Sequence, residues 1–416
     1  MSLVQNIEDV LGRLSAGASI IASPGCAQPT TLLMALAQHA KEKDGIRLYS
    51  GLQITYPFLD AIQRGHLHYL SWHPATALNN LVADGVVDYF PVRASQVPGL
   101  LAEIKADTVF VRVSPPDRHG FYSLGPSVSY TLEALKYARF VVAEIDEQMP
   151  RTFGASFVHE SKFDAFITSE HPMPEYKSRK PSAEIEIIIK NILELLPENP
   201  MLQIGLGSIP EALVHKLADT NLGKLKLTGM ISDAVVDLYQ CGVIQQDDLY
   251  PSPPLLAVEL MGTRRLMEFA DLNPLLSMSP STWIHEPKHV GNNQRFISIN
   301  SALQMDLTGQ INNECIGNRQ ISGIGGSVDF NEAARMSDGG LRILAFTSTA
   351  NNGELNRIVP AISRDGITTI PRHSCDIVVT EYGVARMSAL TLRERAEAMI
   401  SIAHPKFRDE LANEIN

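Results

Sequence analysis

The sequence predicts an α/β protein of two domains whose sheets are largely parallel. The chain has 416 residues, which is more than one domain usually holds. Short apolar and β-branched runs alternate with helical patterns along both halves. The halves also begin alike, because segments 19–36 and 201–214 each read as strand, glycine-containing turn, proline in the first helical turn, and helix. Two domains of similar plan explain this likeness, and a chance similarity of two such units is the alternative.

The expected strands are short and rich in apolar or β-branched residues. They are 19–23, 108–113, 140–144, 201–204, 341–346 and 377–380. Helices are expected from Pro29, from Pro210 and from near Ser182. The third helix has isoleucine and leucine at helical spacing, at Ile185, Ile188, Ile189, Ile192 and Leu196.

A linker is expected at 171–181, which is rich in proline and basic residues and has no apolar period. It would divide the chain into an N-terminal α/β domain, 1–175, and a C-terminal α/β domain, 182–416. Each domain would hold an open, mainly parallel sheet.

Two glycine-rich turns are the most informative local features. They are Gly205 to Glu211 and Ser322 to Ser327, and each follows an apolar or β-branched stretch. Glycine between a strand and a helix lets the backbone approach an anionic ligand, whose charge then faces the helix N-terminus. Ligands of parallel sheets sit beyond the carboxyl ends of the strands, where both turns are expected. A simple tight turn is the alternative for either one.

Composition narrows the class of protein. Apolar residues make up 44% and charged residues 19%, which favours large cores over disorder. The net charge of -11 opposes nonspecific nucleic-acid binding and offers no polybasic membrane patch. The four cysteines lie far apart, no apolar run approaches bilayer length, and no signal peptide is apparent. We therefore expect a soluble, cytoplasmic protein with reduced thiols.

Several kinds of site are not expected. The twelve histidines show no metal-ligand spacing, so no metal is predicted. There is no Gly-x-Ser-x-Gly elbow of a serine hydrolase. The first glycine turn lacks the third glycine and the ribose-binding acid of a nicotinamide site.

A series of segments spread along the chain resembles the acetyl-CoA hydrolase/transferase family, which includes 4-hydroxybutyrate, butyryl and succinyl-CoA:acetate CoA-transferases. The matching segments are 113–120, 148–154, 205–213, 261–266, 298–303, 306–311, 322–330, 380–385 and 402–408.

The resemblance implies two CoA-transferase-like α/β domains with the site between them, and a homodimer or larger homo-oligomer. It implies acyl-CoA and a carboxylic acid as substrates, with no permanently bound cofactor and no nucleic-acid or membrane partner. The second turn would also supply amide donors near the thioester carbonyl. The residues that it implies in CoA or acyl binding are Gly205, Leu206, Gly207, Ser208, Ile209, Gly323, Gly325, Gly326 and Ser327.

The family reaction depends on a glutamate that attacks the acyl-CoA carbonyl, forming first an acyl-glutamyl anhydride and then a glutamyl-CoA thioester. In the matching stretch, 225–234, the position of this glutamate is occupied by Gly229. Glycine has no side chain to act as a nucleophile. The resemblance therefore predicts that ordinary double displacement is absent or very weak.

Three other carboxylates are candidates to replace the missing glutamate. Asp233 is expected at a helix N-terminus as a cap. Glu314 matches a family carboxylate and is a catalytic candidate, although an orienting hydrogen-bond acceptor is the favoured interpretation. Glu259 replaces an apolar strand residue, and an exposed position is the favoured interpretation.

Two functions follow from these observations. One is an enzyme acting on acyl-CoA, a carboxylate CoA-transferase type with hydrolysis as a neighbouring outcome, for which Glu314 or Glu259 would supply the general base. The other is a catalytically silent CoA-binding protein. Retained glycine turns with a lost nucleophile fit both.

Overall fold

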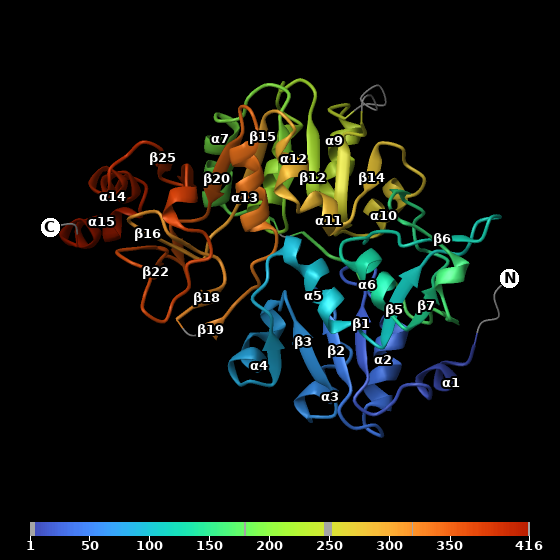
Figure 1. The fold of residues 1–416 in the computed structure, drawn as a ribbon. Coiled ribbons are helices and arrows are strands. Elements are labelled where there is room, and N and C mark those ends of the chain that lie inside the picture. The colour runs from blue at the N-terminus through green and yellow to red at the C-terminus, as the bar shows by residue number, and fades with distance from the viewer. Residues whose placement is uncertain (1–4, 179, 245–251, 318, 415–416) are drawn as a thin grey trace.

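The computed structural model describes residues 5–178, 180–244, 252–317 and 319–414. These residues form a mixed α/β fold with two large, mainly parallel sheets, which confirms the predicted fold class. Figure 1 shows the sheets in two adjoining lobes, blue to cyan for the first half and green to orange for the second.

The first sheet has seven strands, paired in parallel in the order β10-β7-β5-β1-β2-β3-β4. Their bounds are β1 Ser19–Ala22, β2 Arg47–Ser50, β3 His68–Ser71, β4 Val87–Tyr89, β5 Thr108–Val113, β7 Phe140–Ile145 and β10 Ala165–Thr168. The helices of this half are α1 Ile7–Leu11, α2 Thr30–His39, α3 Leu59–Gln63, α4 Asn79–Ala83, α5 Val97–Ile104 and α6 Thr131–Tyr137.

The second sheet has nine strands in the order β25-β24-β20-β15-β11-β12-β13-β14-β8, and only the β24–β25 pair among these described strands is antiparallel. Their bounds are β8 Phe153–Gly154, β11 Met201–Ile204, β12 Lys226–Ile231, β13 Leu255–Leu260, β14 Leu276–Met278, β15 Phe296–Asn300, β20 Leu341–Ala345, β24 Ile377–Thr380 and β25 Gly383–Arg386. Its helices are α7 Ala183–Leu193, α8 Ser208–Leu217, α9 Ala234–Gln240, α10 Arg264–Ala270, α11 Ser281–Ile284, α12 Pro287–Gly291, α13 Ser327–Met336, α14 Leu392–Ser401 and α15 Pro405–Asn413.

Smaller strand pairs complete the fold. They are β6 Phe121–Ser123 with β9 Phe157–His159, β18 Cys315–Ile316 with β19 Arg319–Gln320, β21 Thr349–Ala350 with β22 Leu355–Asn356, and β16 Gln304–Asp306 with β17 Ile311–Asn312 and β23 Ile358–Val359.

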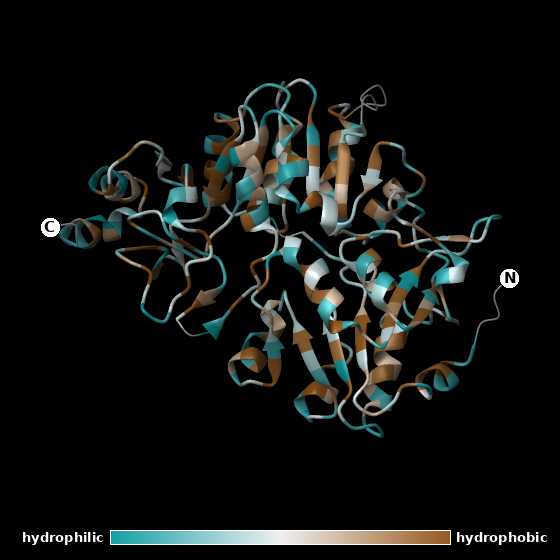
Figure 2. Cartoon of the chain, viewed as in Figure 1, coloured by the Kyte–Doolittle hydropathy of each residue, from teal (hydrophilic) through white to brown (hydrophobic). Residues whose placement is uncertain are grey.

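The burial of the strands explains their composition. Every residue of β1, β5 and β11 is buried, as expected where helices cover both faces of a parallel sheet. Figure 2 shows the resulting hydrophobic colour along the strands of both lobes. One hydrophobic cluster includes Val113 and Tyr130 from the first half and Leu202, Ile231 and Leu260 from the second. The two halves therefore share a core.

The predicted helix starts are confirmed. Pro29 is the N-cap of α2, Ser182 is the N-cap of α7, and Pro210 is the third residue of α8. Proline is tolerated there because the first backbone N–H groups of a helix have no intrahelical acceptor. Helix α7 buries its isoleucines at 185, 188, 189 and 192, as the helical period predicts.

Arg112 on β5 ties the segment 171–181, which has no helix or strand among its described residues, to the first sheet. Its side chain is completely buried, and its Nη2 lies 2.8 Å from the Asp146 carboxylate. The same guanidinium donates to the carbonyl oxygens of His171 and Pro172. Glu144, 3.8 Å away, adds a second buried carboxylate. Burial raises the pKa of Glu144, and Arg112 opposes that rise.

No helix in the described parts of the chain combines the length and apolar character that a membrane crossing needs.

Candidate functional site

The two glycine turns meet in one cavity. It has a volume of about 320 Å³ and lies between the two halves of the chain. The first turn connects β11 to α8, and the second leads into α13. Seven of the site residues predicted from the sequence line this cavity: Gly205, Leu206, Gly229, Gly323, Gly325, Gly326 and Ser327. The first half contributes Gly51, Leu52, Trp72, His73, Ser129 and Tyr130.

Three predicted residues lie beside the cavity without lining it. Gly207 is the N-cap of α8 and has a φ of 120°, which glycine adopts readily. Ser208 and Ile209 form the first turn of α8, and Ile209 is buried. These residues place the N-terminus of a ten-residue helix behind Gly205 and Leu206.

The second turn is pressed against the first half of the chain. A Cβ atom at Gly323 would lie 2.4 Å from the carbonyl oxygen of Trp72 and 3.0 Å from the Cα of His73. The backbone N–H of Ala94 donates to the carbonyl of Gly325 at 2.8 Å. Glycine at 323 is therefore required by contact between two backbones, whatever the ligand.

We expect Gly323→Ala to displace this turn, since the atoms that it would meet are backbone atoms. The variant should lose about 1–3 kcal/mol of stability, the usual range for overpacking, and bind coenzyme A at least about tenfold more weakly, which corresponds to 1.4 kcal/mol. Thermal unfolding and titration calorimetry with coenzyme A would measure both.

Gly99→Ala in α5 is the matched control. Gly99 is exposed, and a Cβ there would meet no atom within 4 Å. If both variants bound coenzyme A as tightly as the unaltered protein, the prediction that the ligand contacts the second turn would be contradicted.

Gly229 occupies an irregular point of β12. It has a φ of 100°, and the pairing of β12 with β13 shifts register between Gly229 and Met230. A Cβ atom at Gly229 would lie 2.5 Å from the carbonyl oxygen of Ile204. The backbone at this position therefore suits glycine and would strain any other residue.

Glu259, on the neighbouring strand, also lines the cavity. It pairs in register with Met230, and the residue is 5% exposed. Its Oε2 atom is buried and has no hydrogen-bond partner among the described residues. Burial raises the pKa of this carboxyl to about 7, and the nearby Ser129 hydroxyl opposes the rise.

The expectation that Glu259 is exposed is thus wrong. The segment 126–129 from the first half covers β13, with a bridge between Ser127 and Glu259. The N–H of Leu260 also donates to the Pro126 carbonyl at 2.7 Å. This cover comes from residues about 130 positions earlier in the chain, so the local pattern around Glu259 carries no sign of it.

Two histidines in the cavity wall were not singled out from the sequence. His73 lies against Gly323 and Gly325, and His285 lies against Gly326. Burial lowers the pKa of each imidazole to about 4, so both are neutral at pH 7. The Nδ1 of His285 is buried without a partner in the described part of the structure. Neither histidine belongs to a recognisable motif, so only the fold brings them to the second turn.

The other carboxylates considered from the sequence are engaged elsewhere. Glu314 is buried outside the cavity lining, and its two oxygens accept from Thr369 Oγ1 at 2.7 Å and Tyr89 Oη at 3.0 Å. Asp233 is the N-cap residue of α9, but its carboxylate accepts from the N–H groups of Thr263 and Leu266, so it stabilises the start of α10. These contacts favour orienting roles for both.

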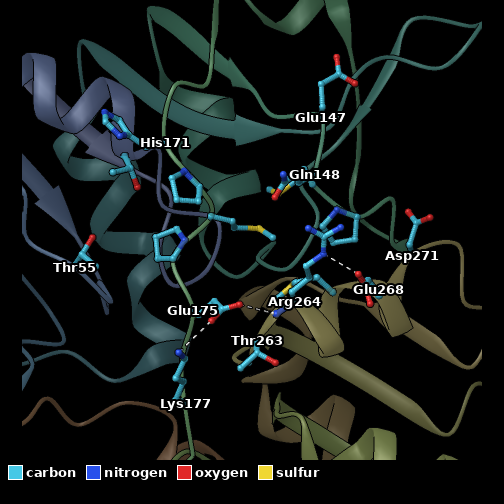
Figure 3. Close-up of a pocket in the computed structure, with 18 residues that line it drawn as sticks. Thr55, Glu147, Gln148, His171, Glu175, Lys177, Thr263, Arg264, Glu268 and Asp271 are labelled. Atoms are coloured by element: carbon cyan, nitrogen blue, oxygen red, sulfur yellow. Dashed lines mark hydrogen bonds and ion pairs between the residues drawn. The ribbon is translucent and has the colours of Figure 1, made fainter.

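A second, larger cavity of about 980 Å³ lies beside the linker (Figure 3). Its charged side chains mostly face one another. The side chains of Arg264 and Glu268 are 2.7 Å apart, and the Glu175 carboxylate lies 3.7 Å from Lys177 and accepts from the backbone N–H of Arg264. It contains neither glycine turn and neither Gly229 nor Glu259. The smaller cavity is therefore the better candidate for the reaction.

Among the described residues, no group of three or more histidine, cysteine, aspartate or glutamate side chains is placed to hold a metal ion.

Known proteins resemble this chain over almost its whole length. Family models match twice, the acetyl-CoA hydrolase/transferase N-terminal domain over 3–174 and its C-terminal domain over 262–415. A 4-hydroxybutyrate coenzyme A transferase of Clostridium kluyveri is 36% identical, with 98% of this chain and 96% of the relative covered.

Two solved structures share the fold. RipA from Yersinia pestis superposes with a TM-score of 0.90 at 32% identity, covering 99% of this chain and 96% of that one. A 4-hydroxybutyrate CoA-transferase from Porphyromonas gingivalis gives 0.80 at 32% identity, covering 98% and 96%. With both domain models matched and such coverage, the chain belongs to the acetyl-CoA hydrolase/transferase family.

Proposed function

We propose that this protein binds acyl-CoA in the 320 Å³ cavity and acts on its thioester without the family's double displacement through position 229. The observation that carries the proposal is the lining of one cavity by both glycine turns and by Gly229. The family and the relatives support a function of the CoA-transferase or acetyl-CoA hydrolase type.

The turns supply the means of binding. Each stands at the start of a ten-residue helix, α8 or α13, whose first backbone N–H groups have no intrahelical acceptor. Such groups bind anionic or developing negative charge, on a phosphate or on the oxygen of a tetrahedral intermediate. The glycines let the ligand approach the backbone closely. Neutral His73 and His285 add N–H groups to the wall without a competing positive charge.

The loss of the carboxylate at 229 limits the reaction. Without it, the acyl group cannot be stored as an anhydride on β12, nor can CoA be held there as a glutamyl thioester. The acyl group would then have to pass directly to an acceptor in the cavity. Water is the smallest such acceptor, so an acyl-CoA hydrolase is the second candidate function, and the carboxylate of Glu259 in the same cavity favours it.

An exchange experiment tests the proposal. The protein is incubated with acetyl-CoA and labelled acetate, and labelled acetyl-CoA is measured together with free CoA. We expect coenzyme A binding by calorimetry but no label exchange above the protein-free rate. Rapid exchange by the unaltered protein would contradict the loss of double displacement, and absence of coenzyme A binding would contradict the site.

Gly229→Glu and Gly229→Ala form a matched pair for the same assay. Both place a Cβ against the Ile204 carbonyl and both carry the strain of a φ of 100°, which costs of order 1–3 kcal/mol. They differ in the carboxylate. Exchange that appears with glutamate and not with alanine would support a cavity that lacks only its nucleophile.

The cytoplasmic location expected from the sequence and the homo-oligomer implied by the family resemblance remain predictions beside this proposal.

A further inference from the structure

A buried carboxylate lines the cavity from β13. This strand lies next to β12, on which Gly229 stands at the position of the family glutamate. Glu259 on β13 is in register with Met230, the residue after Gly229 on β12. Both Glu259 and Gly229 line the cavity. The buried Oε2 without a hydrogen-bond partner is unusual, because a buried polar atom left unpaired costs about 1–3 kcal/mol. A buried polar atom that is retained at such a cost is expected to have a function or to bind a partner.

The turn at Gly25, which packs against this side chain, leaves room for it. A Cβ atom at Gly25 would lie 2.9 Å from Glu259 Oε2 and 2.9 Å from Met261 Sδ. Gly25 has a φ of 60°, and its N–H donates to the Leu52 carbonyl at 2.9 Å, which holds the turn in place. The glycine therefore keeps the space beside the carboxylate open.

No cation faces Glu259 in the described structure. The titratable groups whose charges it influences are the Cys26 thiol of the facing turn and the Tyr130 phenol of α6's N-cap. Burial raises the pKa of both, so both stay neutral at pH 7. Beside them is the Ser129 hydroxyl. A carboxylate in such surroundings is a stronger base than one in water, because its charged form is poorly solvated.

We propose that Glu259 is the general base that activates water for direct hydrolysis of the acyl-CoA thioester. This inference rests on the proposed binding of acyl-CoA in the same cavity. The assignment departs from the family pattern, in which the acting carboxylate belongs to the β12 position.

The step balances with water as the only added reactant. The Glu259 carboxylate takes a proton from water while the water oxygen forms a bond to the thioester carbonyl carbon. The carbonyl oxygen becomes an oxyanion, which the amide N–H groups of the glycine turns can stabilise. When the intermediate collapses, the carbon–sulfur bond breaks and the sulfur receives the proton from Glu259. The products are the free carboxylic acid and CoA thiol.

The shift of the Glu259 pKa to about 7 agrees with this role. A general base works best when its pKa lies near the working pH, and one positioned base contributes about 10²–10⁴-fold to a rate. The active form is the carboxylate, so hydrolysis should increase as pH rises through about 7.

The test compares the unaltered protein with Glu259→Gln, measuring CoA thiol released from acetyl-CoA. We expect kcat to fall at least about 100-fold, while coenzyme A affinity stays within about threefold, since the contacts assigned to CoA are made by the turns. The rise of kcat/KM with pH near 7 should disappear in the variant.

Glu144→Gln is the control, since Glu144 is also a buried carboxylate but lies outside the cavity lining, beside Arg112. It should keep hydrolysis within about threefold, and thermal unfolding checks that both variants fold. A hydrolysis rate and pH profile unchanged in Glu259→Gln would overturn the role of Glu259 while leaving acyl-CoA binding intact.

Two other outcomes are equally informative. If exchange of labelled acetate into acetyl-CoA depends on Glu259, the residue is a nucleophile and the general-base assignment is wrong. If coenzyme A does not bind the unaltered protein, the proposed function itself fails, and the calorimetry identifies that failure independently of any rate.

Discussion

Arg112→Met should lower the free energy of unfolding by about 3–5 kcal/mol, the usual effect of removing one partner from a buried ion pair. Arg112 is completely buried, with Asp146 at 2.8 Å and Glu144 at 3.8 Å. Methionine replaces the aliphatic part of the arginine side chain but has no charge, so both carboxylates would remain buried without compensation. The carbonyls of His171 and Pro172 would also lose their donor. Chemical denaturation at pH 7 would measure the loss.

Arg112→Lys separates charge from geometry. Lysine keeps the positive charge but cannot reproduce the planar fork that reaches Asp146 and the linker carbonyls together. Its stability should lie between those of the unaltered protein and Arg112→Met. If Arg112→Met proved as stable as the unaltered protein, the interactions of Arg112 would only balance the cost of burying its charge. The structural role assigned to Arg112 would then be wrong.

Glu259→Gln should make the protein more stable relative to the unaltered chain as pH rises, by about 3 kcal/mol between pH 5 and pH 8. Burial raises the pKa of Glu259 from 4.5 to about 7, and one pKa unit corresponds to about 1.4 kcal/mol. Between these values the folded state holds the proton more tightly than the unfolded state. Stability contributed by the protonated carboxyl is therefore lost as pH rises through 7. Glutamine does not titrate and escapes that loss.

Urea unfolding of both proteins at pH 5 and pH 8 provides the measurement. Asp329, whose pKa burial raises to about 6, is present in both and cancels from the comparison. If the difference in unfolding free energy between the two proteins were the same at pH 5 and pH 8, folding would not change the pKa of Glu259. The expected effect of burial on this carboxyl would then be contradicted. The expected combination of greater stability with lost hydrolysis is typical of residues kept for function.

The regular elements could be predicted because their signals are local. The continuous apolar runs of β5 and β11 and the isoleucine spacing of α7 follow from burial on both faces of a sheet or on one face of a helix. The glycine turns could be located for the same reason. That both line one cavity needed the fold, since they are more than one hundred residues apart.

The surroundings of Glu259 could not be predicted. Its cover comes from segment 126–129 and its open space from Gly25, both in the other half of the chain. His73 and His285 approach the second turn from different halves in the same way. The sequence could show a carboxylate in a strand, but burial by distant segments decides its pKa and its chemistry.

Strand β8 bears on whether this architecture is modular. It belongs to the first half of the chain, yet it pairs with β14 at the edge of the second sheet, and a Cβ at its Gly154 would lie 2.3 Å from the Met278 carbonyl. A cut through the linker would leave the second half with an unprotected sheet edge, open to intermolecular strand pairing. The protein is therefore poorly suited to expression as separate halves or to recombination of halves between relatives, and a workable division would have to carry residues 153–154 with the second sheet.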